Sequence, residues 1–136
     1  MYKTILVPID TSHIERAAAM FSAAKTLCSA DGDIVCLNVF HEIPELAPIG
    51  IPTELFPNLM GNAREELQSA INAADVNAHI EIRSGHPART ALDIAEQLDA
   101  DLIVVGSHKP GLEDYFLGST AARIVRHAKC SVLVQR

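Results

Sequence analysis

The sequence has little cysteine and little positive charge. Cys28, Cys36 and Cys130 are odd in number, lie in apolar surroundings and form no CxxC pair, which excludes a disulfide framework and a zinc site of the CxxC kind. We interpret them as small core residues. Lys and Arg number 11 against 17 Asp and Glu, for a formal net charge of −6. This balance opposes general nucleic-acid binding, although a local patch could still hold one nucleotide.

Long apolar runs are also absent. No stretch reaches the roughly 18 uninterrupted apolar residues of a membrane span. The chain starts directly with the strand-like MYKTILVPID, without the charged and then apolar leader of a secreted protein. We therefore expect no membrane partner and a cytoplasmic location. With 136 residues, of which 49% are hydrophobic and 21% charged, the chain predicts one compact soluble domain over residues 1–136.

Several familiar site signatures are missing as well. No GxGxxG follows the first apolar run and no GxxxxGK[ST] occurs, which excludes simple dinucleotide and P-loop sites. Asp10, His108 and Ser119 could form an acid, histidine and serine set, but Ser119 lacks the GxSxG turn of such hydrolases, so we disfavour a catalytic triad. No two histidines have the spacing of helical metal ligands, and we expect no metal held by protein side chains alone.

The most informative stretch is residues 102–134, which reads as strand, loop, helix and strand. Leu102–Val105 is apolar throughout, as in a strand that is covered on both faces of a parallel sheet. Helical spacing then begins beside Gly118, with Ser119 or Thr120 available as the cap. A helix start carries unpaired N–H groups and positive dipole, so it favours an anion such as phosphate. The alternative is an ordinary helix start without a ligand.

The remaining chain alternates strands with helices. A strand at Ile5–Val7, a helix that ends near Gly32, and a strand over Ile34–Phe40 come first. Ser12 and Glu15 have the spacing of a capping box for that helix. The later elements are a helix over Leu59–Ala74, a strand over Ala78–Arg83, a helix from Pro87 to Leu98, and the strand Ser131–Val134 that follows the helix beside Gly118.

This pattern predicts an α/β fold with a five-stranded parallel sheet and helices on both faces, doubly wound and Rossmann-like. The third strand alternates apolar with polar residues, as an edge does, whereas the first and fourth are fully apolar, so we predict the strand order 3-2-1-4-5. The winding then reverses between strands one and four. Ligands of open α/β sheets bind at such a reversal, where Asp10 and Thr11 should meet Gly106, Ser107 and His108.

The segment His41–Pro57 is unusually long for a connection and contains four prolines. Its many apolar residues predict that it lies against a pocket or a partner. Packing on its own domain is an equally good interpretation.

The motifs VPID at residues 7–10 and GSH…LGST…RIVRHAKCSVLV at the carboxyl end resemble the universal stress protein family, and the resemblance covers essentially the whole chain. It implies a small cytoplasmic α/β protein, usually a homodimer. One branch of the family binds ATP, and its mark is Gly, two residues, Gly, nine residues, then Gly followed by Ser or Thr.

By this resemblance, Gly106 matches the first glycine, Gly118 and Ser119 match the last pair, Asp10 matches the acidic residue beside the ribose, and the backbone of Val39 matches a contact with adenine. The chain departs from the pattern at Lys109, where the second glycine is expected, and the interval from Gly106 to Gly118 is one residue short. Such a shortened S-H-[KR]-P loop resembles one subgroup. The residues predicted to bind the nucleotide are Pro8, Asp10, Thr11, Val39, Gly106, His108, Lys109, Gly111, Gly118, Ser119 and Thr120.

We therefore predict an ATP-binding stress-response sensor or regulator, with magnesium bound only through the phosphates. It should not be an enzyme beyond a very slow ATPase, because no group is arranged for phosphoryl transfer. The alternative is a dimeric protein-interaction module without a nucleotide. In either case the bare apolar strand containing Val132, Leu133 and Val134 predicts a homodimer, with a higher oligomer as the alternative and with protein partners that the sequence does not name.

Overall fold

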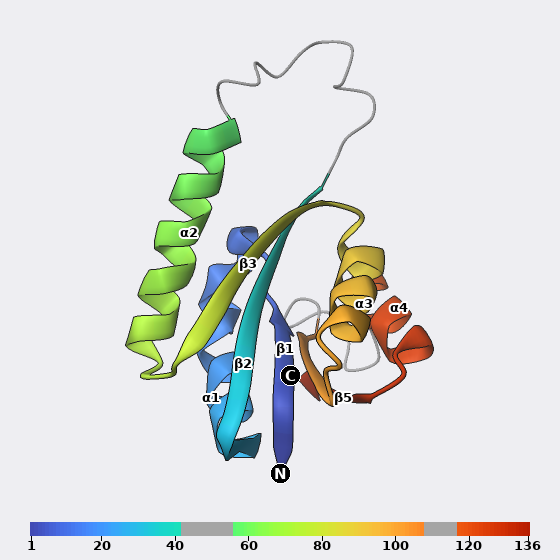
Figure 1. Ribbon diagram of the computed structural model, residues 1–136. Helices are drawn as coiled ribbons and strands as arrows, with labels where there is room; N and C mark the ends of the chain where they lie inside the picture. Colours follow the sequence, from blue (N-terminus) through green and yellow to red (C-terminus); the bar gives the residue numbers. More distant parts are fainter. Residues whose placement is uncertain (42–55, 108–116) are drawn as a thin grey trace.

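The fold is taken from a computed structural model, which describes residues 1–41, 56–107 and 117–136 (Figure 1). None of the helices in these ranges has the length and apolar character needed to cross a membrane. The elements in chain order are β1 Tyr2–Pro8, the 3-10 helix η1 Thr11–Arg16, α1 Ala17–Leu27, β2 Cys28–His41, α2 Phe56–Ala73, β3 Ala78–Gly85, α3 Pro87–Gln97, β4 Leu102–Gly106, α4 Ser119–His127 and β5 Ser131–Gln135.

The strands form one five-stranded sheet in the order β3-β2-β1-β4-β5, which confirms the predicted fold class and strand order. Every pairing is parallel. The central strand β1 places Ile5 beside Ile34 of β2 on one side and beside Leu102 of β4 on the other. The direction of winding therefore reverses between β1 and β4, and the carboxyl ends of these two strands lie next to each other.

Two helical layers cover the sheet, with α1 and α2 on one face and α3 and α4 on the other (Figure 1). Alternate residues of β1 serve the two layers: Ile5 and Val7 pack with α1 and α2, whereas Leu6 packs with α3 and α4. All three are fully buried. Burial on both faces explains why this strand has an unbroken apolar run.

The first helical segment differs from the prediction at both ends. Ser12 and Glu15 form no capping box; the side chain of Asp10 accepts the N–H of Ser12 instead, and a 3-10 turn precedes α1. His13, at φ −128° and ψ 42°, interrupts helical geometry within that turn. The α-helix ends at Leu27 rather than near Gly32, because β2 already begins at Cys28 and pairs there with Tyr2.

The cysteines also differ from one another more than predicted. Cys36 is a core residue, and burial raises the pKa of its thiol to about 12. Cys28 and Cys130 are only partly buried, so the interpretation as core residues is wrong for both. Burial raises the pKa of these two thiols as well. All three cysteines are free.

The two edge strands have contrasting chemistry. The outer strand β3 carries charged side chains, including an ion pair of 2.7 Å between Arg83 and Glu81. The opposite edge, β5, presents Val132, Leu133 and Val134, all partly buried, with Val132 and Val134 against the α3–α4 layer and Leu133 against the α1–α2 layer. An apolar edge of this kind favours pairing with another strand.

We predict that the chain is a symmetric dimer through β5 and that Val134→Lys converts it to a monomer, because a charge on the apolar edge opposes strand pairing. Light scattering gives the mass, and circular dichroism checks that the variant folds, since Val134 also packs on the core. His79→Lys on the opposite edge β3 is the matched control. A folded Val134→Lys variant with the mass of a dimer would place the interface elsewhere.

Candidate functional site

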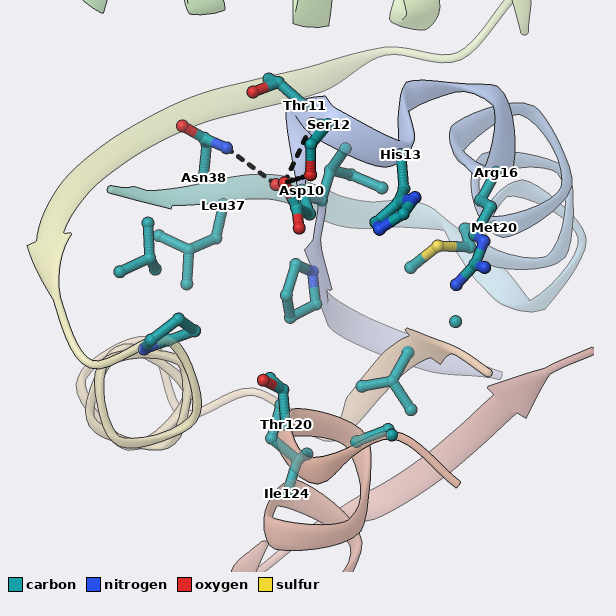
Figure 2. A pocket seen from close by; sticks show the side chains of 18 of the residues that line it. Asp10, Thr11, Ser12, His13, Arg16, Met20, Leu37, Asn38, Thr120 and Ile124 are labelled. Atoms are coloured by element: carbon teal, nitrogen blue, oxygen red, sulfur yellow. Dashed lines mark hydrogen bonds between the residues drawn. The ribbon is translucent and has the colours of Figure 1, made fainter. Parts of the chain in front are cut away.

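A cavity of about 720 Å³ opens at the reversal of the sheet, beyond the carboxyl ends of β1, β2 and β4 (Figure 2). Its walls come from these strand ends, from η1, and from the start of α4. The predicted site residues that line it are Pro8, Asp10, Thr11, Val39, Gly106, Gly118, Ser119 and Thr120. The structure thus brings these residues together, as the strand order predicted. Their roles in binding remain predictions.

Three other predicted site residues, His108, Lys109 and Gly111, lie outside the described residues. Residues 42–55 also lie outside the described residues. The structure therefore does not test the prediction that the segment 41–57 lies against a pocket or a partner.

Asp10 owes its position to the hydrogen bonds of its neighbour. The N–H of Ile9 donates to the Leu37 carbonyl at 2.8 Å, and the Ile9 carbonyl accepts from the Asn38 side-chain amide at 2.9 Å. Both backbone groups of Ile9 are therefore tied to β2. The next residue, Asp10, uses one carboxylate oxygen to accept the Ser12 N–H at 2.9 Å and the Ser12 hydroxyl at 2.7 Å. Its other oxygen points into the cavity (Figure 2).

The start of α4 forms the opposite wall. The cap is Gly118, at φ −56° and ψ 155°, and no side chain caps the helix. The prediction that Ser119 or Thr120 is the cap is therefore wrong; both lie within the first turn. The first intrahelical bond that the backbone shows here runs from the Ala122 N–H to the Gly118 carbonyl, at 2.8 Å. The N–H groups ahead of it have no helical partner and present positive charge to the cavity.

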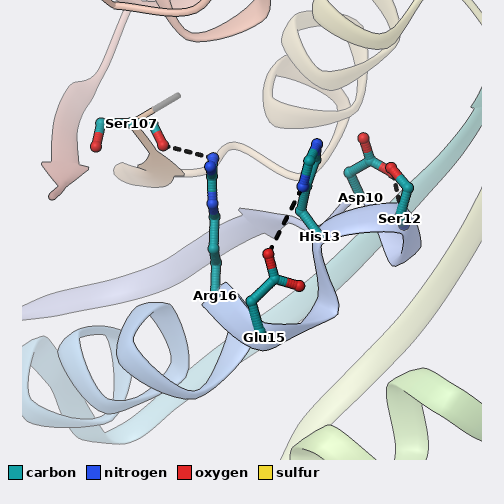
Figure 3. A network of polar contacts seen from close by, with 6 residues as sticks. All are labelled: Asp10, Ser12, His13, Glu15, Arg16 and Ser107. Atoms are coloured by element: carbon teal, nitrogen blue, oxygen red, sulfur yellow. Dashed lines mark hydrogen bonds and ion pairs between the residues drawn. The ribbon is translucent and has the colours of Figure 1, made fainter. Parts of the chain in front are cut away.

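Arg16, which no sequence pattern singled out, comes from η1 and reaches across to the end of β4. Its Nη1 donates to the Ser107 carbonyl at 2.6 Å (Figure 3). The N–H of Ser107 in turn donates to the Gln135 carbonyl at 2.8 Å. Beside it stands His13, whose Nδ1 lies 3.6 Å from the Glu15 carboxylate. Nothing in the sequence indicated this position, because the direction of the Arg16 side chain depends on a 3-10 turn, whereas the apolar spacing predicted an α-helix.

Asn38 is the single polar residue of the predicted strand Ile34–Phe40. It is 4% exposed, and its side chain points to the opposite side of β2 from Leu37 (Figure 2). Its amide nitrogen holds Ile9, whereas its Oδ1 has no hydrogen-bond partner within the described ranges. Asn38 therefore acts on the site through the backbone that carries Asp10.

We predict that Asn38→Asp lowers the free energy of unfolding by about 1–3 kcal/mol at neutral pH, because the Ile9 carbonyl loses its donor. Burial raises the pKa of the new carboxyl, and its protonated form can donate to Ile9 again, so the loss relative to the parent should shrink as the pH falls. Urea denaturation at neutral and mildly acidic pH measures this. Asn62→Asp, on an exposed position of α2, is the control. A pH-independent loss would contradict the role assigned to the amide.

Metal ligation by the protein has no support in the described part of the chain, where no three His, Cys, Asp or Glu side chains gather around one point.

Comparison with known proteins agrees with this architecture. The model of the universal stress protein family matches residues 1–136. The chain is 31% identical over 147 residues to universal stress protein G of Escherichia coli O157:H7, with 100% of both chains covered. It is similar to the solved structure of universal stress protein UspA from Lactobacillus plantarum, with 30% identity, a TM-score of 0.73, and 99% and 98% of the two chains covered. It is also similar to a universal stress protein solved in complex with cAMP, with 25% identity, a TM-score of 0.61, and 99% and 97% of the chains covered. The chain belongs to the universal stress protein family.

Proposed function

We propose that this protein binds an adenine nucleotide, principally ATP, and acts as a stress-response sensor or regulator through its nucleotide-bound state. The observation that carries the proposal is the cavity in which the Asp10 carboxylate faces the open start of α4. The relative in complex with cAMP supports the class of ligand, because cAMP is itself an adenine nucleotide.

The residues of the cavity suit the parts of a nucleotide. Asp10 keeps one oxygen directed into the cavity, where it can accept hydrogen bonds from ribose hydroxyls. The N–H groups at Ser119 and Thr120 suit phosphate oxygens, since helix starts bind anions. Val39, at the end of β2, offers backbone and apolar surface to the base. A volume of about 720 Å³ lies within the range of small-molecule sites.

Gly118 has a specific part in this proposal. Its backbone, at φ −56° and ψ 155°, is one that any residue can adopt, so backbone conformation alone does not require glycine there. What a side chain would change is the space in front of the helix start. We propose that glycine at this position allows a phosphate to approach the main chain closely.

Magnesium, if it accompanies the nucleotide, would be held through the phosphates rather than by a cluster of protein ligands. Asp10 is the carboxylate that lines the cavity among the described residues, and one of its oxygens already accepts two hydrogen bonds from Ser12.

The proposed role is occupancy rather than turnover. Asp10 and His13 line the cavity, but no group among the described residues is arranged to stabilise a transferring phosphoryl group. We therefore propose no enzymatic activity beyond very slow ATP hydrolysis.

The second candidate is a protein-interaction module of the same fold that holds no nucleotide. The apolar edge of β5 favours it, since pairing through that edge needs no ligand. Both candidate functions include a homodimer or a higher oligomer, and both allow further protein partners. The family resemblance implies that the protein works in the cytoplasm.

We predict that Gly118→Val lowers the affinity for ATP at least tenfold, which is about 1.4 kcal/mol, because a branched side chain occupies the approach to the helix start. Isothermal titration calorimetry measures the affinity, with and without magnesium. The matched control is Gly61→Val: Gly61 lies in α2, and a Cβ there would meet nothing within 4 Å. Equal ATP affinity in both variants and the parent would contradict the placement of the phosphates. A parent that binds no ATP would leave the interaction module as the function.

We further predict that purified protein releases phosphate from ATP more slowly than roughly 1 s⁻¹, the lower end of kinase rates. A coupled phosphate assay on the parent and on Asp10→Asn measures this. Release at kinase-like rates that disappears in Asp10→Asn would show an enzyme and overturn the proposal of occupancy.

A further inference from the structure

Arg16 is a cation without a counter-ion in the described part of the chain. Its one hydrogen bond within the described residues goes to the Ser107 carbonyl, at 2.6 Å, and no ion pair among those residues includes it. The nearby Glu15 lies against His13 instead. A guanidinium carries five N–H donors in a planar fork, so the bond to Ser107 leaves most of them to other partners.

The position of Arg16 is fixed by its surroundings. It is partly buried and lines the same cavity as Asp10 and Thr120. A Cβ at Gly106 would lie 3.3 Å from the sulfur of Met20 and 3.9 Å from Cδ of Arg16. The stem of Arg16 therefore packs close to the main chain of β4, in space that the absence of a side chain at Gly106 leaves open.

The order of the strands gives Arg16 a particular place along the cavity. The end of β2 contributes Val39, the end of β1 contributes Asp10, and the end of β4 is held by Arg16 through Ser107. Since β1 lies between β2 and β4, Arg16 stands at the end of the cavity away from β2. Figure 2 shows this arrangement, with Asp10 between Leu37 and Arg16.

A nucleotide bound as proposed would have its base toward β2 and its ribose at Asp10. Its phosphates would then extend past the start of α4 toward β4, which is where the Arg16 guanidinium lies. Phosphate is a good partner for such a group, because the planar fork of arginine matches two phosphate oxygens at once.

We propose that Arg16 determines specificity for the length of the phosphate chain: its guanidinium, held on the Ser107 carbonyl, binds the terminal phosphoryl groups of a nucleoside di- or triphosphate. This inference rests on the proposed function. It adds that the site favours ATP and ADP over AMP and adenosine, and it assigns the preference to one side chain.

Calorimetric titration with adenosine, AMP, ADP and ATP tests this on the parent, Arg16→Gln and Arg16→Lys. In Arg16→Gln the affinity for ATP should fall at least about tenfold, whereas that for adenosine should stay within about twofold. Arg16→Lys should lose less, because the ammonium keeps the charge but not the fork. The difference between parent and Arg16→Gln for ATP should shrink at high salt. Arg64→Gln, an exposed change of the same charge on α2, is the control.

Two results would overturn the inference while leaving nucleotide binding intact. One is an unchanged affinity for ATP in Arg16→Gln. The other is an equal loss for all four ligands, which would mean that Arg16 only shapes the cavity through Ser107. A parent that binds none of the four ligands would instead reject the proposed function, and the inference about Arg16 with it.

Discussion

The reversal of winding between β1 and β4 is the constraint on which the site depends. Parallel strands need crossover helices, and each crossover covers one face of the sheet with its own helix. Where the direction reverses, the crossovers leave to opposite faces, and the strand ends between them stay uncovered. In this chain the uncovered ends are those of β1 and β4, and the carboxylate of Asp10, the fork of Arg16 and the start of α4 all face that opening.

The charges of the cavity are arranged in a way that suits a nucleotide better than a simple anion. The Asp10 carboxylate lies in the middle of the cavity, between the ends of β2 and β4, and would repel a phosphate placed there. The helix start at Ser119 and the guanidinium of Arg16 supply positive charge away from it. A ligand with a neutral hydroxyl-bearing centre and an anionic end satisfies both groups. The overall charge of −6 therefore does not prevent the binding of one nucleotide, since the local groups decide.

Much of the fold could be predicted because burial leaves a clear mark in sequence. The unbroken apolar run of Ile5–Val7 and the alternation in Ala78–Arg83 were enough to place a central and an edge strand, and hence the order of all five. That order in turn placed Asp10 beside Gly106. The geometry of the first helical segment was harder to predict, because Asp10 rather than Ser12 is the cap and a 3-10 turn follows it. The spacing of apolar residues does not indicate such a turn. Arg16 could not be predicted for the same reason, since the direction of its side chain depends on that turn. The role of Asn38 could not be predicted either, because its amide acts on the site through a hydrogen bond to the Ile9 backbone.

We propose that one adenine nucleotide spans the cavity from Asp10 to the start of α4. The most direct test is an amide-resolved NMR titration of the whole chain with ATP. We expect the largest shifts to fall together on Asp10, Val39, Ser119 and Thr120 and to saturate with one dissociation constant, while the amides around Cys130, at the opposite end of α4, stay unchanged. Shifts confined to β5, or none at the four residues while ATP binds, would contradict it.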